Sequence, residues 1–212
     1  PDNPELHRRA LRSSIEVCAS LGAELLVLDY EEQSTDPLVE ERFRQAHAEA
    51  ADYAAALGVS LGLENIEGDE VDPVVECVRK IDHRNLFLTL DVGHAFLAAN
   101  YFRVDFLQSL RQALPHGGHV HLSDNAGTFE ELRLTDRAHY DVLPTGYRFT
   151  YGRGDIHIPP FWGEIPYAEV FALLRQYRGI YLCEYKFEMF LPFNASIQQQ
   201  VRSAIMAERA SG

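Results

Sequence analysis

The sequence predicts an α/β fold, a (β/α)8 TIM barrel that lacks its first two βα units in this chain. Short apolar runs alternate with helical patterns, which is typical of parallel strands joined by helical crossovers. The runs recur at roughly 30-residue intervals, the length of one βα unit. A whole barrel takes about 250 residues, whereas this chain has 212 and opens on a helical pattern. We therefore expect a single, N-terminally incomplete domain over residues 1–212. The alternative is a six-stranded open doubly wound sheet.

The first half of the chain alternates helices and strands regularly. In order, we expect a helix from the N-terminus to Gly22, a strand over 24–29, a helix over 37–57, a strand over 59–64, a helix over 72–81 and a strand over 86–91. Asp2 or Asn3 followed by Pro4 is typical of a helix start, and Gly22 and Gly58 are typical helix stops. The strand runs are apolar and end in an acid, which favours buried parallel strands.

The second half continues the pattern with one interruption. In order, we expect a helix over 104–113, a strand over 118–122, a long polar and aromatic stretch over 124–153, a doubtful strand over 155–158, a helix over 165–177, a strand over 180–184 and a helix over 195–207. Several Arg and aromatic residues lie within the loop over 125–151. We expect this loop to form a lid over the barrel mouth, where Arg could contact a phosphate or carboxylate; the alternative is a disordered insertion.

Composition and charge exclude several classes of protein. The 32 acidic and 19 basic residues give a net charge of -13, which opposes general binding to a phosphate backbone, so a nucleic-acid partner is not expected. No apolar run approaches the ~18 residues of a membrane span. The three cysteines form no CxxC pair, so neither a disulfide framework nor a thiolate zinc site is indicated. We expect a cytoplasmic protein, and leave a homo-oligomer open.

Four metal-capable residues end or nearly end the expected strands. They are Glu64, Asp91, His121 and Glu184. The carboxyl ends of parallel strands line the active site of such folds, and a charged group ending a core strand is costly unless it is paired or coordinates a metal. The alternative for each acid is a helix cap. Two Glu, one Asp and one His suit Mn, Mg, Co or Zn as a divalent metal ion.

Further candidate residues lie near these strand ends. His94, Asp155 and His157 are candidates for a second metal or for substrate; the alternatives are a helix-start residue for His94 and turn residues for the other two. His119 is interpreted as a core histidine. The remaining histidines are interpreted as surface residues: His7, His47, His83, His116 and His139. Arg153, Trp162 and Lys186 are candidate substrate contacts, with Lys186 expected on the same strand face as Glu184.

Several short motifs follow one another in a specific order. They are Leu63-Glu64-Asn65, Asp91-Val92-Gly93-His94, His119-Val120-His121-Leu122-Ser123-Asp124, Gly152-Arg153-Gly154-Asp155, Gly163-Glu164-Ile165-Pro166 and Leu182-Cys183-Glu184. This succession resembles the xylose isomerase-like TIM-barrel superfamily, which includes sugar and sugar phosphate isomerases and epimerases and the endonuclease IV-like enzymes. The resemblance implies one divalent metal on Glu64, Asp91, His121 and Glu184. It also implies that the two glutamates act as acid and base.

The resemblance leaves three functions open. The first is a metal-dependent isomerase or epimerase of a small sugar, polyol or sugar phosphate, acting by proton transfer alpha to a carbonyl through a cis-enediolate. The second is an endonuclease IV-like zinc phosphoesterase acting on abasic DNA, which the pair Asp155 and His157 resembles. That branch needs a further His on the third strand, where this chain has Asp29 and Tyr30. The third is a non-catalytic metal-binding barrel. We expect the first, with Glu64 and Glu184 facing each other across the mouth.

Overall fold

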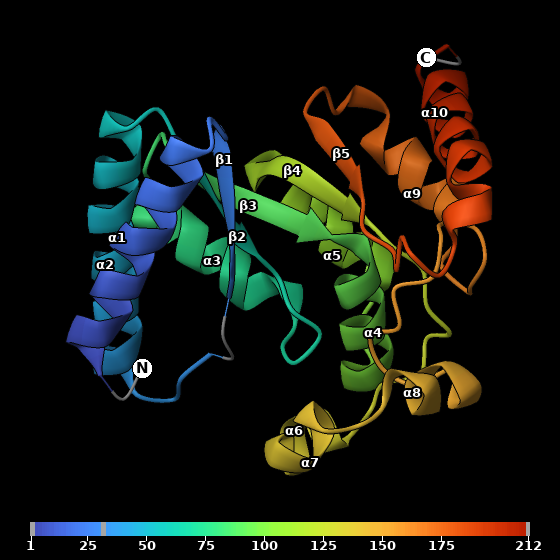
Figure 1. The fold of residues 1–212 in the computed structure, drawn as a ribbon, viewed down its shortest axis with the longest axis horizontal. Helices are drawn as coiled ribbons and strands as arrows, with labels where there is room; N and C mark the ends of the chain where they lie inside the picture. Colours follow the sequence, from blue (N-terminus) through green and yellow to red (C-terminus); the bar gives the residue numbers. More distant parts are fainter. Residues whose placement is uncertain (1–2, 31–32, 211–212) are drawn as a thin grey trace.

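The computed structural model describes residues 3–30 and 33–210. Five parallel strands form one curved sheet in the order β1-β2-β3-β4-β5 (Figure 1). Their bounds are β1 Leu25–Asp29, β2 Ser60–Glu64, β3 Leu86–Asp91, β4 Gly117–Leu122 and β5 Ile180–Cys183. The sheet is an open half-barrel, which confirms the predicted barrel class. All five strands lie where the apolar runs predicted them, to within one or two residues.

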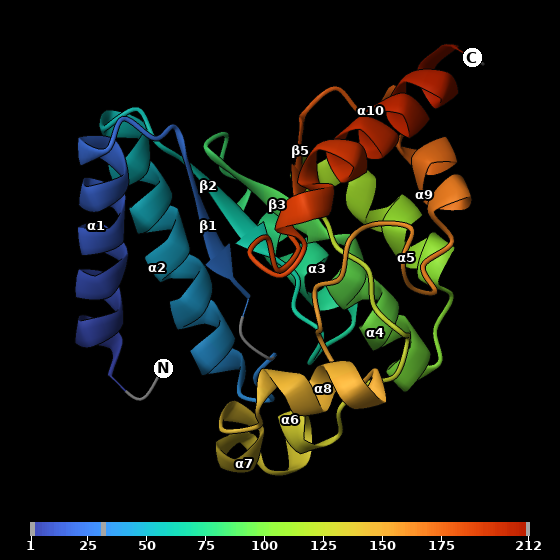
Figure 2. The ribbon, with the colours of Figure 1, turned by 45° about the vertical axis from the view of Figure 1, so that its right-hand side comes forward.

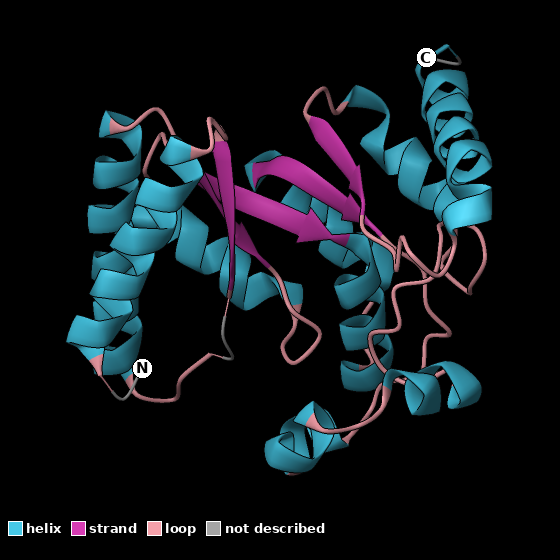
Figure 3. Cartoon of the chain, in the orientation of Figure 1, coloured by secondary structure: helices cyan, strands magenta, loops and turns pink. Residues whose placement is uncertain are grey.

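Helices cover the outer face of the sheet (Figure 3). The long ones are α1 Pro4–Ser20, α2 Pro37–Ala56, α3 Val71–Ile81, α4 Val92–Phe102, α5 Phe106–Ala113, α9 Tyr167–Leu173 and α10 Asn194–Ala210. Asn3 caps α1 by accepting a hydrogen bond from the Leu6 amide at 3.0 Å, as predicted, while Asp2 lies outside the described residues. Outward-facing strand residues such as Leu61, Leu88 and Val120 are fully buried and belong to the main core cluster.

One helix was not predicted from the sequence. α4 begins directly after β3, whereas the apolar pattern predicted a helix only over 104–113. Asp91 explains the difference because it is both the last residue of β3 and the N-cap of α4, with its Oδ1 accepting from the His94 amide at 2.6 Å. Because the strand and the helix share a boundary residue, no polar or Gly-rich loop separates them in the sequence. His94 therefore lies in the first turn of a helix, as its interpretation as a helix-start residue predicted.

The stretch over 124–158 also differs from the prediction. It is ordered and holds three short helices, α6 Leu132–Thr135, α7 Arg137–Asp141 and α8 Thr145–Tyr151. Figure 2 shows them grouped on the side of the sheet toward which β1 runs, the side of the carboxyl ends. The doubtful strand over 155–158 is wrong: this segment forms only an isolated antiparallel bridge between Asp124 and Ile158. β5 therefore pairs directly with β4.

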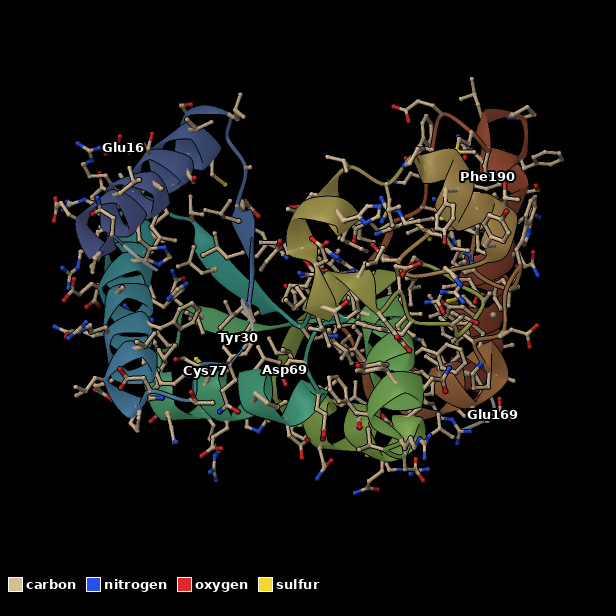
Figure 4. The ribbon with its side chains drawn as sticks, turned by 90° about the horizontal axis from the view of Figure 1, so that it is seen from below. Glu16, Tyr30, Asp69, Cys77, Glu169 and Phe190 are labelled. Carbon is tan, nitrogen blue, oxygen red and sulfur yellow. The ribbon has the colours of Figure 1, made fainter. Side chains whose placement is uncertain are left out.

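Both edges of the half-barrel are open. Within the described residues, β1 pairs with β2 alone and β5 with β4 alone. The view from below places Tyr30, just past β1, and Phe190, beyond β5, on different sides of the molecule (Figure 4). On the inner face of β5, Ile180 and Leu182 are 61% and 44% exposed. Unpaired strand edges beside exposed apolar side chains favour association between chains.

We expect residues 1–212 to self-associate in a concentration-dependent way. Sedimentation velocity over a hundredfold range of protein concentration should show the average mass rising, and Leu182→Lys should reduce that rise because an edge lysine opposes strand pairing. Leu57→Lys, on an exposed leucine away from the sheet edges, is the control. A monomer at every concentration would show that the open edges are not adhesive.

His47 is a correction to the predicted surface histidines. It is only 1% exposed and packs on Phe43, with the ring centroids 3.9 Å apart. Its Nδ1 donates a hydrogen bond to the Phe43 carbonyl at 2.8 Å. The amphipathic pattern of α2 is weak because alanines occupy most of its buried positions, so the sequence did not show which face His47 occupies. Burial lowers the pKa of His47 to about 4.

The buried His47 predicts a pH dependence of stability. The unfolded chain binds a proton near pH 6.5 and the folded chain only near pH 4, so the contribution is complete above pH 6.5 and is lost as the pH falls toward 4. At pH 5 the loss is about 2 kcal/mol. Urea unfolding at pH 7 and pH 5 should show a smaller decrease for His47→Gln than for the parent. An unchanged decrease would mean that His47 titrates normally.

Within the described residues, no helix is both long and apolar enough to cross a bilayer.

Candidate metal centre

The parallel register brings the four strand-end residues to one place. Asp91 is paired with His121 across β3 and β4, and Glu64 ends β2, whose neighbour is β3. Glu184 follows β5 directly, and its amide donates to the Leu122 carbonyl at 2.9 Å, which continues the β4–β5 pairing by one step. Because side chains alternate between the faces of a strand, all four point to the inner face while Leu63, Leu90 and Leu122 point to the helices.

The four side chains meet around the imidazole of His121. Its Nδ1 lies 2.9 Å from Glu64 Oε1, 2.5 Å from Glu184 Oε2 and 3.9 Å from Asp91 Oδ2. One ligand atom from each residue lies within 4.8 Å of the others. Glu64, Asp91 and His121 are buried, whereas the Glu184 side chain is 40% exposed. Glu64 and Glu184 therefore both approach Nδ1 of His121, and Glu184 is the more exposed of the two carboxylates.

Burial and mutual charge shift the pKa of each group. Burial raises the pKa values of Glu64 and Asp91. Burial alone would lower the pKa of His121, but its hydrogen bonds to Glu184 and Glu64 raise it to about 10. The hydrogen bond and charge of His121 outweigh burial at Glu184 and lower its pKa. The two glutamates thus have pKa shifts of opposite direction.

The donor set fits a divalent cation. Three carboxylates converge on one imidazole, and Oδ2 of the fully buried Asp91 has no hydrogen-bond partner in residues 3–30 and 33–210. A buried carboxylate without a partner is costly, and a bound cation removes that cost. Hard oxygen ligands with one imidazole suit Mn, Mg, Co or Zn. The geometry thus agrees with a metal centre on Glu64, Asp91, His121 and Glu184.

A second cluster joins His94, Asp155 and His157. Asp155 Oδ2 lies 3.5 Å from His94 Nε2 and 2.5 Å from His157 Nε2. The Nδ1 atoms of the two histidines donate to the Asn65 carbonyl at 2.9 Å and the Glu184 carbonyl at 2.6 Å. His157 has a φ of 48°, an uncommon conformation for a residue with a side chain. The structure therefore groups these three residues, which also offer ligand atoms for a metal ion.

Asp155 and the imidazoles of this cluster shift one another's pKa values in opposite directions. Burial alone would lower the pKa of His157, but the charge and hydrogen bond of Asp155 raise it to about 9. The charges of His94 and His157 outweigh burial at Asp155 and lower its pKa. The two clusters are neighbours, since His94 Nδ1 lies 3.7 Å from Asp91 Oδ1 and 3.9 Å from Glu64 Oε1.

Comparison with known sequences decides the family. The sequence model of the xylose isomerase-like TIM barrel matches residues 1–205. The chain belongs to this family. Among curated proteins, an uncharacterised protein of Methanocaldococcus jannaschii, MJ1311, is 33% identical over 90 residues, which cover 40% of this chain and 30% of that protein. This chain thus aligns with less than a third of that relative.

Solved structures of similar fold extend beyond this chain. A xylose isomerase domain protein from Planctomyces limnophilus has a TM-score of 0.68 at 16% identity, with 96% of this chain and 67% of that chain covered. An L-ribulose 3-epimerase gives 0.63 at 16% identity, with 96% and 68% covered. An IolI protein with a bound zinc atom gives 0.61 at 16% identity, with 96% and 67% covered. At these identities the likeness shows the shared fold.

In this xylose isomerase-like chain, His119 occupies the inner layer below the metal centre. It is buried, as predicted for a core histidine, and its ring meets His121 edge-on with centroids 4.6 Å apart. Burial lowers its pKa to about 4. Its Nδ1 has no hydrogen-bond partner in the described part of the chain, so the prediction of a hydrogen-bonded core histidine is correct for its burial and wrong for its Nδ1. His119 thus packs under His121 as a neutral ring.

The three predicted substrate contacts have separate surroundings in the structure. Arg153 is exposed, with Nη1 3.8 Å from Glu130 Oε2. Trp162 is 48% exposed and meets Phe190 and Phe193 with centroids 5.5 Å apart. Lys186 is not on a strand, since β5 ends at Cys183, and its amide donates to the His157 carbonyl at 3.0 Å. Their contact with substrate stays a prediction.

Sequence reasoning missed the contacts that hold α6, α7 and α8, the segment expected to form a lid. Glu67, in the loop after β2, accepts from Arg133 Nε at 2.9 Å and from the Tyr140 hydroxyl at 3.2 Å. Arg148 Nη1 donates to Tyr140 Oη at 3.3 Å and to the Asp155 carbonyl at 3.4 Å. α6, α7 and α8 are thereby tied to the end of β2 and to the second cluster. These partners are far apart in sequence, so no local signal identifies them.

Proposed function

We propose that this chain carries the active site of a divalent-metal-dependent isomerase or epimerase of a small sugar, polyol or sugar phosphate. The observation that carries the proposal is the approach of both Glu64 and Glu184 to the same atom, Nδ1 of His121. Two carboxylates with opposite pKa shifts beside one metal site are the arrangement expected of an acid and a base. The family and the L-ribulose 3-epimerase of similar fold support this class.

Each residue of the site has a role in the proposed reaction. Glu184, which is 40% exposed and has a lowered pKa, takes the proton from the carbon alpha to the substrate carbonyl. The electron pair of that C–H bond moves into the carbonyl and gives the substrate's cis-enediolate. Glu64, the buried carboxylate of the pair, is the acid that returns a proton to the enediolate carbon. Asp91 and His121 complete the metal site, and a bound divalent ion would stabilise the developing oxyanion charge.

A specific observation favours a second function. The cluster of His94, Asp155 and His157 offers ligands for another ion beside the first site, which suits a zinc phosphoesterase acting on abasic DNA. Two observations oppose it: the net charge of -13 and the end of β1, which carries Asp29 and no histidine. A non-catalytic metal-binding barrel is the third function that the experiment must separate.

Metal content and turnover together test the proposal. The protein is purified without chelators, dialysed against Mn²⁺, Co²⁺ or Zn²⁺ and analysed for bound metal. It is then assayed on a panel of ketoses and their phosphates and on duplex DNA with an abasic site. One metal per chain with conversion of a ketose supports the proposal. Two or three zinc with DNA cleavage supports the phosphoesterase. Bound metal without turnover on either panel supports the non-catalytic barrel, and no bound metal overturns all three.

A further inference from the structure

Asn65, the first residue after β2, bonds to the backbone of a candidate metal ligand on the next strand. Its side chain is buried, with the residue 1% exposed. Its Nδ2 donates to the Asp91 carbonyl at 2.9 Å, and its Oδ1 accepts from the Asp91 amide at 2.8 Å. One amide therefore satisfies both backbone polar groups of Asp91. An amide side chain has one donor end and one acceptor end, which this pairing needs.

The Asn65–Asp91 hydrogen bonds take the place of β2–β3 backbone hydrogen bonds, which end before Asp91. The last pair of the β2–β3 register is Glu64 with Thr89, so the ladder stops two residues short of Asp91. Asp91 is fully buried, and an unpaired buried amide or carbonyl is costly. The Asn65 side chain extends the ladder by one step. Because Asn65 directly follows Glu64, this step also sets the distance between the Glu64 and Asp91 side chains.

The same residue touches the second cluster through its own backbone. The Asn65 carbonyl accepts from His94 Nδ1 at 2.9 Å, which leaves His94 Nε2 as the atom that faces Asp155. Asn65 thus contacts Asp91 with its side chain and His94 with its main chain. It is the point where the end of β2, the end of β3 and the first turn of α4 are joined.

We propose that Asn65 is a positioning residue that holds Asp91 in register with Glu64 and so sets the affinity of the metal centre. The proposal rests on the metal centre of the proposed function and is independent of the reaction. Outer partners of this kind fix the orientation of metal ligands, and losing one typically weakens metal binding by about 10- to 100-fold. Asn65 itself offers no ligand atom to the ion, since both ends of its amide are engaged.

The test is a Co²⁺ titration of the folded protein, followed by calorimetry and by the visible absorption of the bound ion. We expect Asn65→Ala to weaken Co²⁺ binding by about 10- to 100-fold and to change the absorption band. Asn85→Ala is the matched control. Asn85 precedes β3 directly, and its Nδ2 donates to the Val59 carbonyl just before β2 and to the Ala51 carbonyl on α2, at the end of these strands away from Asn65. We expect it to lower stability and to leave Co²⁺ affinity and spectrum unchanged.

The outcomes separate this inference from the proposed function. A parent protein that binds no Co²⁺ overturns the metal centre and the inference with it. A parent that binds Co²⁺ while Asn65→Ala binds it equally well overturns the inference alone, as does an equal loss in Asn85→Ala. If Asn65→Ala does not fold, the isosteric Asn65→Asp carries the test: it keeps the acceptor for the Asp91 amide and loses the donor, and parental affinity would overturn the inference.

Discussion

Replacing Glu64 or Glu184 by Gln is expected to lower kcat by roughly two or more powers of ten, the usual contribution of general acid–base catalysis. Gln keeps the shape of the side chain and one oxygen for the metal, but it can neither take nor release the substrate proton. Bound metal should therefore fall far less than turnover. The measurements are kcat on a ketose that the parent converts and metal per chain by elemental analysis. Glu169→Gln, an exposed glutamate on α9 (Figure 4), is the control.

The opposite pKa shifts predict different defects in the two variants. Glu64→Gln retains Glu184, so in heavy water it should still exchange the substrate alpha hydrogen for deuterium while forming little product. Glu184→Gln lacks the base and should do neither. Proton NMR of recovered substrate distinguishes these cases. If both variants keep parental turnover, the proton-transfer roles are wrong. The two carboxylates would then only coordinate the ion, and other groups would transfer the proton.

The metal-capable residues were predictable because each depends on a local pattern. An apolar run that ends in Glu64, Asp91 or His121 locates a strand and its carboxyl end, and parallel strands bring those ends to one edge of the sheet. The alternation of strands and helices along the chain is therefore enough to predict that these side chains lie together. Glu184 follows the same rule. No distance needs to be known for the prediction, because the topology supplies the proximity.

The features that sequence reasoning missed depend on contacts between distant residues. His47 is buried against the rings of Phe43 on α2 and His7 on α1, and the alanine-rich helix has no strong apolar face. The Glu67–Arg133 pair joins a β2 loop to the lid, and its partners carry no motif. The expected strand over 155–158 failed for a related reason. Asp155 and His157 are fixed by ion pairs and by the Glu184 carbonyl, so that segment lies beside the sheet without joining it.

Asp91 and His121 should be required for metal binding before turnover is considered. We expect His121→Ala and Asp91→Ala to lose more affinity than the roughly 10- to 100-fold that an outer partner costs, because each removes a ligand. Equilibrium dialysis against Zn²⁺ or Mn²⁺ measures the loss. Asp91→Ala also removes the cap of α4, which costs about 1 kcal/mol of stability. Loss of metal could then follow from a frayed helix, and the experiment must separate the two effects.

Two further variants make that separation. Asp105→Ala removes the equivalent cap of α5, where Asp105 Oδ1 accepts from the Gln108 amide at 2.8 Å, and we expect it to lose about 1 kcal/mol of stability and no metal. Asp91→Asn keeps an oxygen for the His94 amide and removes the charge, so it should retain α4 and still lose metal. Parental metal content in both Asp91→Asn and His121→Ala would place the ion elsewhere. The cluster of His94, Asp155 and His157 would then be the site to examine, because none of its ligand atoms belongs to either of these two side chains.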